Sequence, residues 1–153
     1  MSLHLPDEAA YREHFVRRYT KMPVMFTHQT GKAPIYFKSN QFDHAFYEST
    51  RRDGAKDQFS LTRARRMDDI ALALGNPALE RRAGWDSKNK RHDHIRCVTV
   101  AVGDFVVIIR LGLTSQGHLR GNFVTCYVAD NSIGKIRRAP TWNQAFCLAE
   151  LTR

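Results

Sequence analysis

The last third of the chain holds three β-rich segments in succession, and they constrain the fold more than any other feature. They cover residues 95–102, 105–111 and 122–129. Branched and aromatic side chains dominate all three, as is typical of strands. Gly103-Asp104 joins the first two so tightly that they must run antiparallel, and a longer turn leads to the third. The sequence therefore predicts an antiparallel meander sheet of three to five strands.

Two longer segments before this sheet have helical patterns. Residues 7–21 begin with acidic and end with basic side chains, which complements a helix dipole, and Pro23 follows them. Residues 61–74 carry apolar side chains at helical spacing. Ser60 is placed to cap this second helix, and residues 75–77, Gly-Asn-Pro, are placed to stop it.

Shorter elements complete the expected order. Residues 24–26 and 35–37 are apolar runs around a glycine turn, which predicts a hairpin or a pair of edge strands. Residues 40–49 and 142–151 each predict a short helix. Helices first and a sheet afterwards indicate an α+β class, with N-terminal helices packed on the C-terminal meander. We expect a single domain over residues 1–153.

The charge of the chain indicates the kind of partner that it binds. Its 153 residues include 24 Lys and Arg against 15 Asp and Glu, a net charge of +9. The excess is largest in residues 51–96, which hold 12 basic and 7 acidic side chains, most of the basic ones Arg. Such a surface attracts polyanions, and RNA or another nucleic acid is the expected partner. A generically basic, soluble surface is the alternative.

Composition also excludes several classes of protein. No apolar run approaches the roughly 20 residues that span a bilayer, and the N-terminus lacks the pattern of a secretory signal. We therefore expect a cytoplasmic protein with no membrane partner. Cys97, Cys126 and Cys147 are scattered among apolar neighbours, which predicts buried free thiols. No glycine-rich nucleotide motif occurs, so no cofactor is expected.

The segment Phe123-Val-Thr-Cys-Tyr-Val-Ala129 is a buried strand that carries two hydroxyl side chains. Thr125 and Tyr127 are two residues apart, so they lie on one face of the sheet, opposite Val124, Cys126 and Val128. Two hydroxyls on one face of a basic protein suggest a site for a phosphodiester. Alternatively, Thr and Tyr are present because they are good strand formers.

Several motifs together resemble a known nuclease superfamily. The matching pieces are a histidine on a short helix, Phe59-Ser-Leu-Thr-Arg63-Ala-Arg65-Arg66-Met-Asp-Asp-Ile70 through Leu74-Gly-Asn-Pro77, the strand at 105–111, and Phe123-Val-Thr125-Cys-Tyr127. They resemble, over roughly residues 40–130, the superfamily that groups barnase, EndoU, colicin-type tRNases and RelE-type toxins, and most of all its small phage and mobile-element nucleases. The resemblance implies a metal-independent ribonuclease, toxin-like or phage-encoded.

Metal-independent cleavage of RNA needs a base, an acid and groups that stabilise a crowded phosphorane. His44 is the first candidate for proton transfer, because histidine titrates near neutral pH. Arg66 and Arg96 are candidates for stabilising the phosphorane. Thr125 and Tyr127 are candidates for positioning the phosphate, and the superfamily pattern places a hydroxyl residue here. An ordinary surface histidine is the alternative for His44.

Other basic and polar residues are candidates for holding the nucleic acid. Arg63 lies three residues before Arg66 on the same helix face, so one phosphate could meet both, although charged helix faces are usually just solvated. The remaining candidates lie in two loops: Lys88, Lys90 and Arg91 for substrate capture, and Thr114 and Ser115 for backbone phosphates.

Three alternatives stay open at this point. His92-Asp93-His94 places two imidazoles on one side of a strand, but no supporting ligand pattern is nearby, and we expect no metal. A non-catalytic nucleic-acid-binding module of phage or mobile-element origin would use the same basic surface. An acidic protein partner, such as a cognate inhibitor, is the third alternative. The sequence does not fix the oligomeric state.

Overall fold

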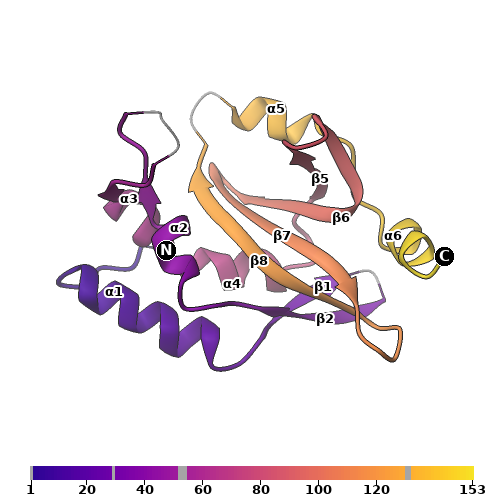
Figure 1. Cartoon of the computed structure of the whole chain (residues 1–153), viewed down its shortest axis with the longest axis horizontal. Coiled ribbons are helices and arrows are strands. Elements are labelled where there is room, and N and C mark those ends of the chain that lie inside the picture. The colour runs from indigo at the N-terminus through magenta and orange to yellow at the C-terminus, as the bar shows by residue number, and fades with distance from the viewer. Residues whose placement is uncertain (1, 29, 52–54, 130–131) are drawn as a thin grey trace.

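A six-stranded mixed sheet forms the centre of the molecule (Figure 1). The computed structural model describes residues 2–28, 30–51, 55–129 and 132–153, with every side chain in them except that of His94. The strands are β1 (Val24–His28), β2 (Gly31–Tyr36), β5 (Arg81–Asp86), β6 (Arg91–Val102), β7 (Phe105–Leu113) and β8 (Leu119–Val128). Their order is β1-β2-β8-β7-β6-β5. β3 (Tyr47–Glu48) and β4 (Gln58–Phe59) form a separate two-stranded ladder.

The α+β class is confirmed, and so are the antiparallel pairs β6–β7 and β7–β8 of the predicted meander. The predicted sheet was too small and too simple. The β1–β2 hairpin joins it through a parallel pairing of β2 with β8, in which Ile35 lies opposite Gly121. A Cβ at residue 121 would come 2.8 Å from the carbonyl oxygen of Arg110 and 2.9 Å from Ile35 Cδ1. Glycine therefore permits the close approach at this junction.

The described residues form six α-helices and one π-helical turn. These are α1 (Glu8–Phe15), the π-helical turn η1 (Val16–Thr20), α2 (Gln41–Ala45), α3 (Leu61–Ala64), α4 (Asp69–Gly75), α5 (Ile133–Arg137) and α6 (Gln144–Leu151). The helix predicted over residues 61–74 is divided in two. Met67 N donates to Ala64 O and Asp69 N to Arg66 O, so bonds across three residues replace the α-helical spacing there.

One face of the sheet carries the core. α1, α2 and α4 gather on this side (Figure 1) and bury a group of aromatic rings against it. The rings of Phe37 and Phe123 stack with centroids 4.6 Å apart, and Phe15 meets both. Because Phe123 lies on β8, this aromatic core holds the strand that carries the two hydroxyls on the opposite face.

Thr125 and Tyr127 lie on the other face of the sheet, as predicted. Thr125 pairs with Ile108 and Tyr127 with Val106, two residues apart on β7, while Cys126 is fully buried in the core. Val124 was predicted to share the face of Cys126, but it is 37% exposed and does not pack in the core with Cys126. A β-bulge between the pairs Ile108–Thr125 and Ile109–Phe123 leaves Val124 unpaired.

The three cysteines are free and buried, as expected. Burial raises the pKa of Cys97 and that of Cys147 to about 11, so both thiols stay protonated at neutral pH. Within the described ranges, no helix combines the length and apolar character needed to cross a membrane.

Candidate functional site

The short helix α2 places His44 at the surface. Phe42, Ala45 and Phe46 are fully buried, which leaves Asp43 and His44 on the exposed side. The side-chain amide of Gln41 donates a hydrogen bond to the carbonyl of Phe123 and so ties α2 to β8. The aromatic neighbours of His44 therefore anchor the helix that carries it.

The carboxylate of Asp43 is directed away from His44. Arg12 on α1 donates to Asp43 at 2.7 Å and to Glu8 at 3.4 Å, and its guanidinium lies 4.4 Å from the ring centroid of Phe42. This agrees with the expectation that neighbouring residues on a helix do not face each other. His44 consequently has no help from the adjacent carboxylate.

Arg63 on α3 reaches the end of α2. Ser60 caps α3 by accepting from Arg63 N at 3.2 Å, and its own N–H donates to Phe46 O at 2.7 Å. One guanidinium nitrogen of Arg63 then donates to Tyr47 O at 3.0 Å and to Ala45 O at 3.3 Å. A positive charge is thereby fixed beside the helix that carries His44.

The charges around His44 create a local excess of positive potential. Partial burial lowers the pKa of His44, and the charges of Lys56 and Arg63 lower it further. The pKa of Lys56 is lowered too, by burial and then by Arg63, while Glu48 acts in the opposite direction. Each of these groups becomes easier to protonate when an anion enters, so the arrangement favours a bound anion.

The same guanidinium influences Tyr127. Burial raises the pKa of Tyr127, and the charge of Arg63 opposes that shift. The phenol therefore stays protonated at neutral pH and can donate a hydrogen bond. We call His44, Lys56, Arg63 and Tyr127 the cationic cluster. Thr125 is half-buried two residues before Tyr127, on the same face.

The cationic cluster contains what phosphodiester chemistry requires. A histidine with a lowered pKa is neutral at pH 7 and can accept a proton. Two cations can stabilise an anionic phosphorane, and a phenol can donate to one of its oxygens. Lys56 lies in a polar stretch without any motif, so the sequence did not point to it. Arg63 was expected to be a nucleic-acid-binding residue only.

The structure does not bring Arg66 into the cationic cluster, which corrects its expected role. Its guanidinium donates to Asp69 at 2.6 Å, to Asp104 at 3.0 Å and to Val102 O at 3.1 Å. It also lies 5.2 Å from the ring centroid of Phe105, on the core side of the sheet. All three of its nitrogens are engaged, and Tyr127 points to the opposite side. Arg66 therefore joins the helices to the β6–β7 turn.

Arg96 is likewise separated from Tyr127. Residues 94–97 form an irregular segment between the pairs Gly84–Asp93 and Ala83–Val98, so regular strand alternation does not set the direction of Arg96. Arg96 instead lines a large pocket together with Phe146 of α6. Figure 1 shows α6 at the opposite end of the molecule from α2 and α3.

The remaining predicted binding residues lie in two exposed turns. Lys88 and Lys90 belong to the β5–β6 turn, where Asp86 accepts from Lys88 N at 3.0 Å, and Arg91 opens β6. Thr114 closes the β7–β8 turn by accepting from Gln116 N and His118 N, and Ser115 is exposed beside it. Neither turn lies close to α2 in Figure 1.

His92, one of the two histidines considered for a metal, contacts an aromatic ring instead. His92 packs edge-on against Trp85 with ring centroids 5.2 Å apart. Asp93 accepts from the backbone N–H groups of Ile95 and Arg96. The side chain of His94 lies outside the described part of the structure. Among the side chains that are described, no group of three or more metal-ligating residues occurs.

Comparisons of this chain with family models, with curated proteins and with solved structures give no match. Function is therefore argued from the residues of the site and their geometry.

Proposed function

We propose that this protein is a metal-independent ribonuclease that cleaves RNA at the cationic cluster. One observation carries the proposal: the charge of Arg63, held by two backbone carbonyls, lowers the pKa of His44 and opposes the rise of that of Tyr127. A proton acceptor and a hydroxyl donor thus lie within the electrostatic influence of one fixed cation. The resemblance to the barnase, EndoU, colicin and RelE superfamily and a cytoplasmic location belong to the same proposal.

Each residue of the cluster has a distinct role in this mechanism. Neutral His44 takes the proton of the ribose 2′-hydroxyl as its oxygen attacks phosphorus. Arg63 and Tyr127 stabilise the phosphorane through its non-bridging oxygens. The bond to the 5′ oxygen breaks, and Lys56, whose pKa is lowered, gives that oxygen a proton. The products are a 2′,3′-cyclic phosphate and a 5′-hydroxyl, and exchange with water restores both protonation states.

The test is an incubation with mixed cellular RNA in EDTA. We expect cleavage by the wild-type protein and a loss of about 10²–10⁴-fold in His44→Ala, the usual contribution of a proton-transfer group. His118→Ala is the matched control, because His118 is exposed in the β7–β8 turn. Equal rates in the two variants would remove His44 from the mechanism. Cleavage only after metal is restored would refute a metal-independent reaction.

A non-catalytic nucleic-acid-binding module is the second candidate function. A specific observation favours it: Arg91, Arg96 and Arg110 surround a large open pocket away from His44. Such a module binds RNA with strong salt dependence and leaves it intact at every protein concentration. In that case His44→Ala leaves the affinity unchanged, which separates the two candidates in the same experiment.

A further inference from the structure

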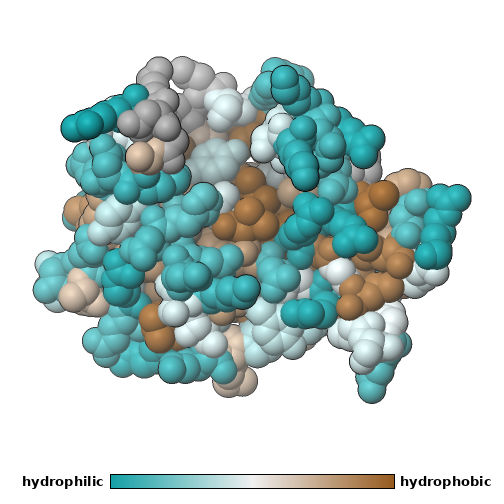
Figure 2. Space-filling view, viewed as in Figure 1, coloured by the Kyte–Doolittle hydropathy of each residue, from teal (hydrophilic) through white to brown (hydrophobic). Residues whose placement is uncertain are grey.

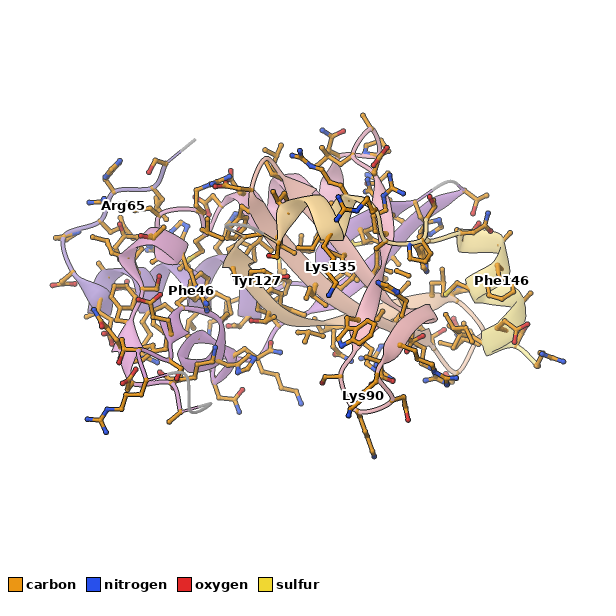
Figure 3. All side chains as sticks on the ribbon, turned by 90° about the horizontal axis from the view of Figure 1, so that it is seen from above. Phe46, Arg65, Lys90, Tyr127, Lys135 and Phe146 are labelled. Atoms are coloured by element: carbon orange, nitrogen blue, oxygen red, sulfur yellow. The ribbon has the colours of Figure 1, made fainter. Side chains whose placement is uncertain are left out.

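We propose that the face of the sheet opposite the core binds several nucleotides of single-stranded RNA, from the cationic cluster to Phe146. The inference deepens the proposed function and rests on it for the identity of the polyanion. Two neighbouring pockets carry it, one sized for a base and one lined by arginines. Figure 3 shows Tyr127 and Lys135 between Phe46 and Phe146, with Phe146 near one end of the molecule.

The first pocket, which we call the base pocket, lies between the sheet and α5. Its volume is about 220 Å³, and its lining includes Trp85, His92, Ile108, Tyr127 and Lys135. This is smaller than the roughly 300–1,000 Å³ typical of drug-sized ligands, and it suits one flat ring system. A lining that combines apolar side chains with hydroxyl and ammonium groups fits a nucleobase, which has apolar faces and polar edges.

The base pocket has a ring that can stack on a base. Trp85 is 53% exposed, although large aromatic side chains are usually well covered in a folded protein. Lys135 Nζ lies 6.0 Å from the centroid of its ring. A tryptophan left open to solvent beside a cation is the combination that binds unpaired bases through stacking and backbone phosphates through charge.

Tyr127 connects the base pocket to the cationic cluster. It lines the pocket, and it also lies within the electrostatic influence of Arg63. A base in the pocket therefore contacts a side chain that also belongs to the cationic cluster. Binding of that base would then position the phosphodiester that is cut.

The second pocket, which we call the arginine pocket, adjoins the base pocket at His92, which lines both. Its volume is about 800 Å³, and it is open to solvent beside Arg91, Arg96 and Arg110. Arg110 follows Ile108 by two residues on β7, so both point to the same face. The floor of one pocket thus continues into the other along a single strand.

Acidic residues in the arginine pocket cancel only part of its positive charge. Asp93 is committed to two backbone N–H groups and lies 3.7 Å from Arg110. Asp86 accepts from the backbone N–H groups of the β5–β6 turn and from the side chain of Asn89. The three arginines outnumber the two aspartates, so the pocket keeps a net positive charge for phosphates.

Phe146 provides a second aromatic ring at the far end of this path. It lines the arginine pocket and is 50% exposed on α6. Figure 2 shows brown, apolar surface between β6 and α6, surrounded by hydrophilic side chains. An aromatic ring at each end and cations between them match bases that are splayed apart, whereas in a duplex the bases are stacked on each other and cannot enter.

The test measures binding without cleavage by using 2′-O-methyl oligoribonucleotides, which lack the attacking hydroxyl. The probes are a mononucleotide and single strands of about four and about eight nucleotides, the range that such grooves cover, with a duplex for comparison. Trp85 is the reporter, because the only other tryptophan, Trp142, is 5% exposed. We expect quenching of Trp85 fluorescence, with affinity that rises with strand length and is weaker for the duplex.

Variants separate the two pockets. Trp85→Ala and Lys135→Gln should weaken all probes, Trp85→Ala by about 5- to 100-fold in a gel shift, since one stacked base is lost. Phe146→Ala should weaken the longest strand alone. Leu72→Ala is the control, because Leu72 is 51% exposed on α4, outside both pockets. Circular dichroism of each variant confirms its fold. The proposal would be overturned if every variant bound the probes as tightly as Leu72→Ala does. It would also be overturned if the wild-type protein bound the duplex as tightly as the single strand.

The two proposals fail in different ways. If unmodified RNA stays intact while the 2′-O-methyl strands bind in the expected pattern, the ribonuclease is refuted and the strand path stands. If RNA is cleaved but Trp85→Ala and Phe146→Ala cleave it with wild-type KM, the strand path is refuted and the ribonuclease stands.

Discussion

Replacing Arg66 with alanine tests whether this residue serves the fold or the chemistry. Its side chain is 26% exposed and bridges three places: Asp69 at the start of α4, and Asp104 and Val102 O at the β6–β7 turn. Asp69 is only 5% exposed in its side chain, so its charge depends strongly on nearby partners. The substitution therefore weakens the attachment of α4 to the sheet.

The expected loss of stability follows from these contacts. Breaking a fully buried ion pair from one side costs about 3–5 kcal/mol, whereas an exposed pair contributes about 0–1 kcal/mol. Arg66 lies between these limits but nearer the first, so we expect a loss of about 2–4 kcal/mol. For a chain of this size each kcal/mol lowers the Tm by about 2–4 °C, which gives a fall of about 4–16 °C.

Urea denaturation and thermal melting measure this loss, and a gel shift in the cold measures RNA binding on the same sample. Arg65→Ala is the control, since it removes the same charge from an exposed neighbour and should change stability by about 0.5 kcal/mol or less. If Arg66→Ala and Arg65→Ala were equally stable, the structural role of Arg66 would be refuted. A variant with wild-type stability and lost cleavage would return Arg66 to the active site.

Three further predictions concern packing, thiols and pH. Gly121→Ala should cost about 1–3 kcal/mol in urea denaturation, because its Cβ would come 2.8 Å from a backbone oxygen. Cys97 and Cys147, with pKa values raised to about 11, should resist iodoacetamide at pH 8 in native protein and react in urea. An NMR titration of His44 should give a pKa below the ordinary value of about 6.5. Since the neutral imidazole is the base, the rate of cleavage should increase as the pH rises through the pKa of His44. The unfolded state binds the proton of His44 more readily than the folded state, so a fall in pH from about 6.5 towards the folded pKa should lower the stability of the protein.

Local sequence patterns were enough for the elements that local forces specify. The acidic start and basic end of residues 7–21 marked the first helix, in which Asp7 accepts from Ala10 N at 2.8 Å. Branched and aromatic side chains and the turns between them marked the meander strands. No local sequence pattern indicated the parallel pairing of β2 with β8. This pairing brings Ile35 beside Gly121, and only the shape of the whole sheet makes those residues neighbours. The size of the sheet could not be predicted for this reason.

The site residues also divide into those that local sequence patterns could place and those that only the whole fold places. The common face of Thr125 and Tyr127 follows from the period of a strand and was predictable. Helical spacing could not distinguish Arg63 from Arg66, because both occupy one face of the expected helix. Asp104, in a distant turn, engages Arg66, while the carbonyls of Ala45 and Tyr47 engage Arg63. Arg96 was misplaced because an irregular segment of β6 breaks the alternation.

Arg63 combines a structural with an electrostatic role, and one substitution can separate them. The last carbonyls of a helix lack partners within it, and Arg63 satisfies Ala45 O at the end of α2 and Tyr47 O at the start of β3. Arg63→Gln keeps an amide donor but removes the charge, whereas Arg63→Ala removes both. We expect Arg63→Gln to melt closer to wild type than Arg63→Ala does, while both raise the pKa of His44 towards its ordinary value. An unchanged pKa of His44 in both variants would contradict the electrostatic coupling on which the cationic cluster rests. Equal melting temperatures of the two variants would show that the carbonyl contacts contribute little.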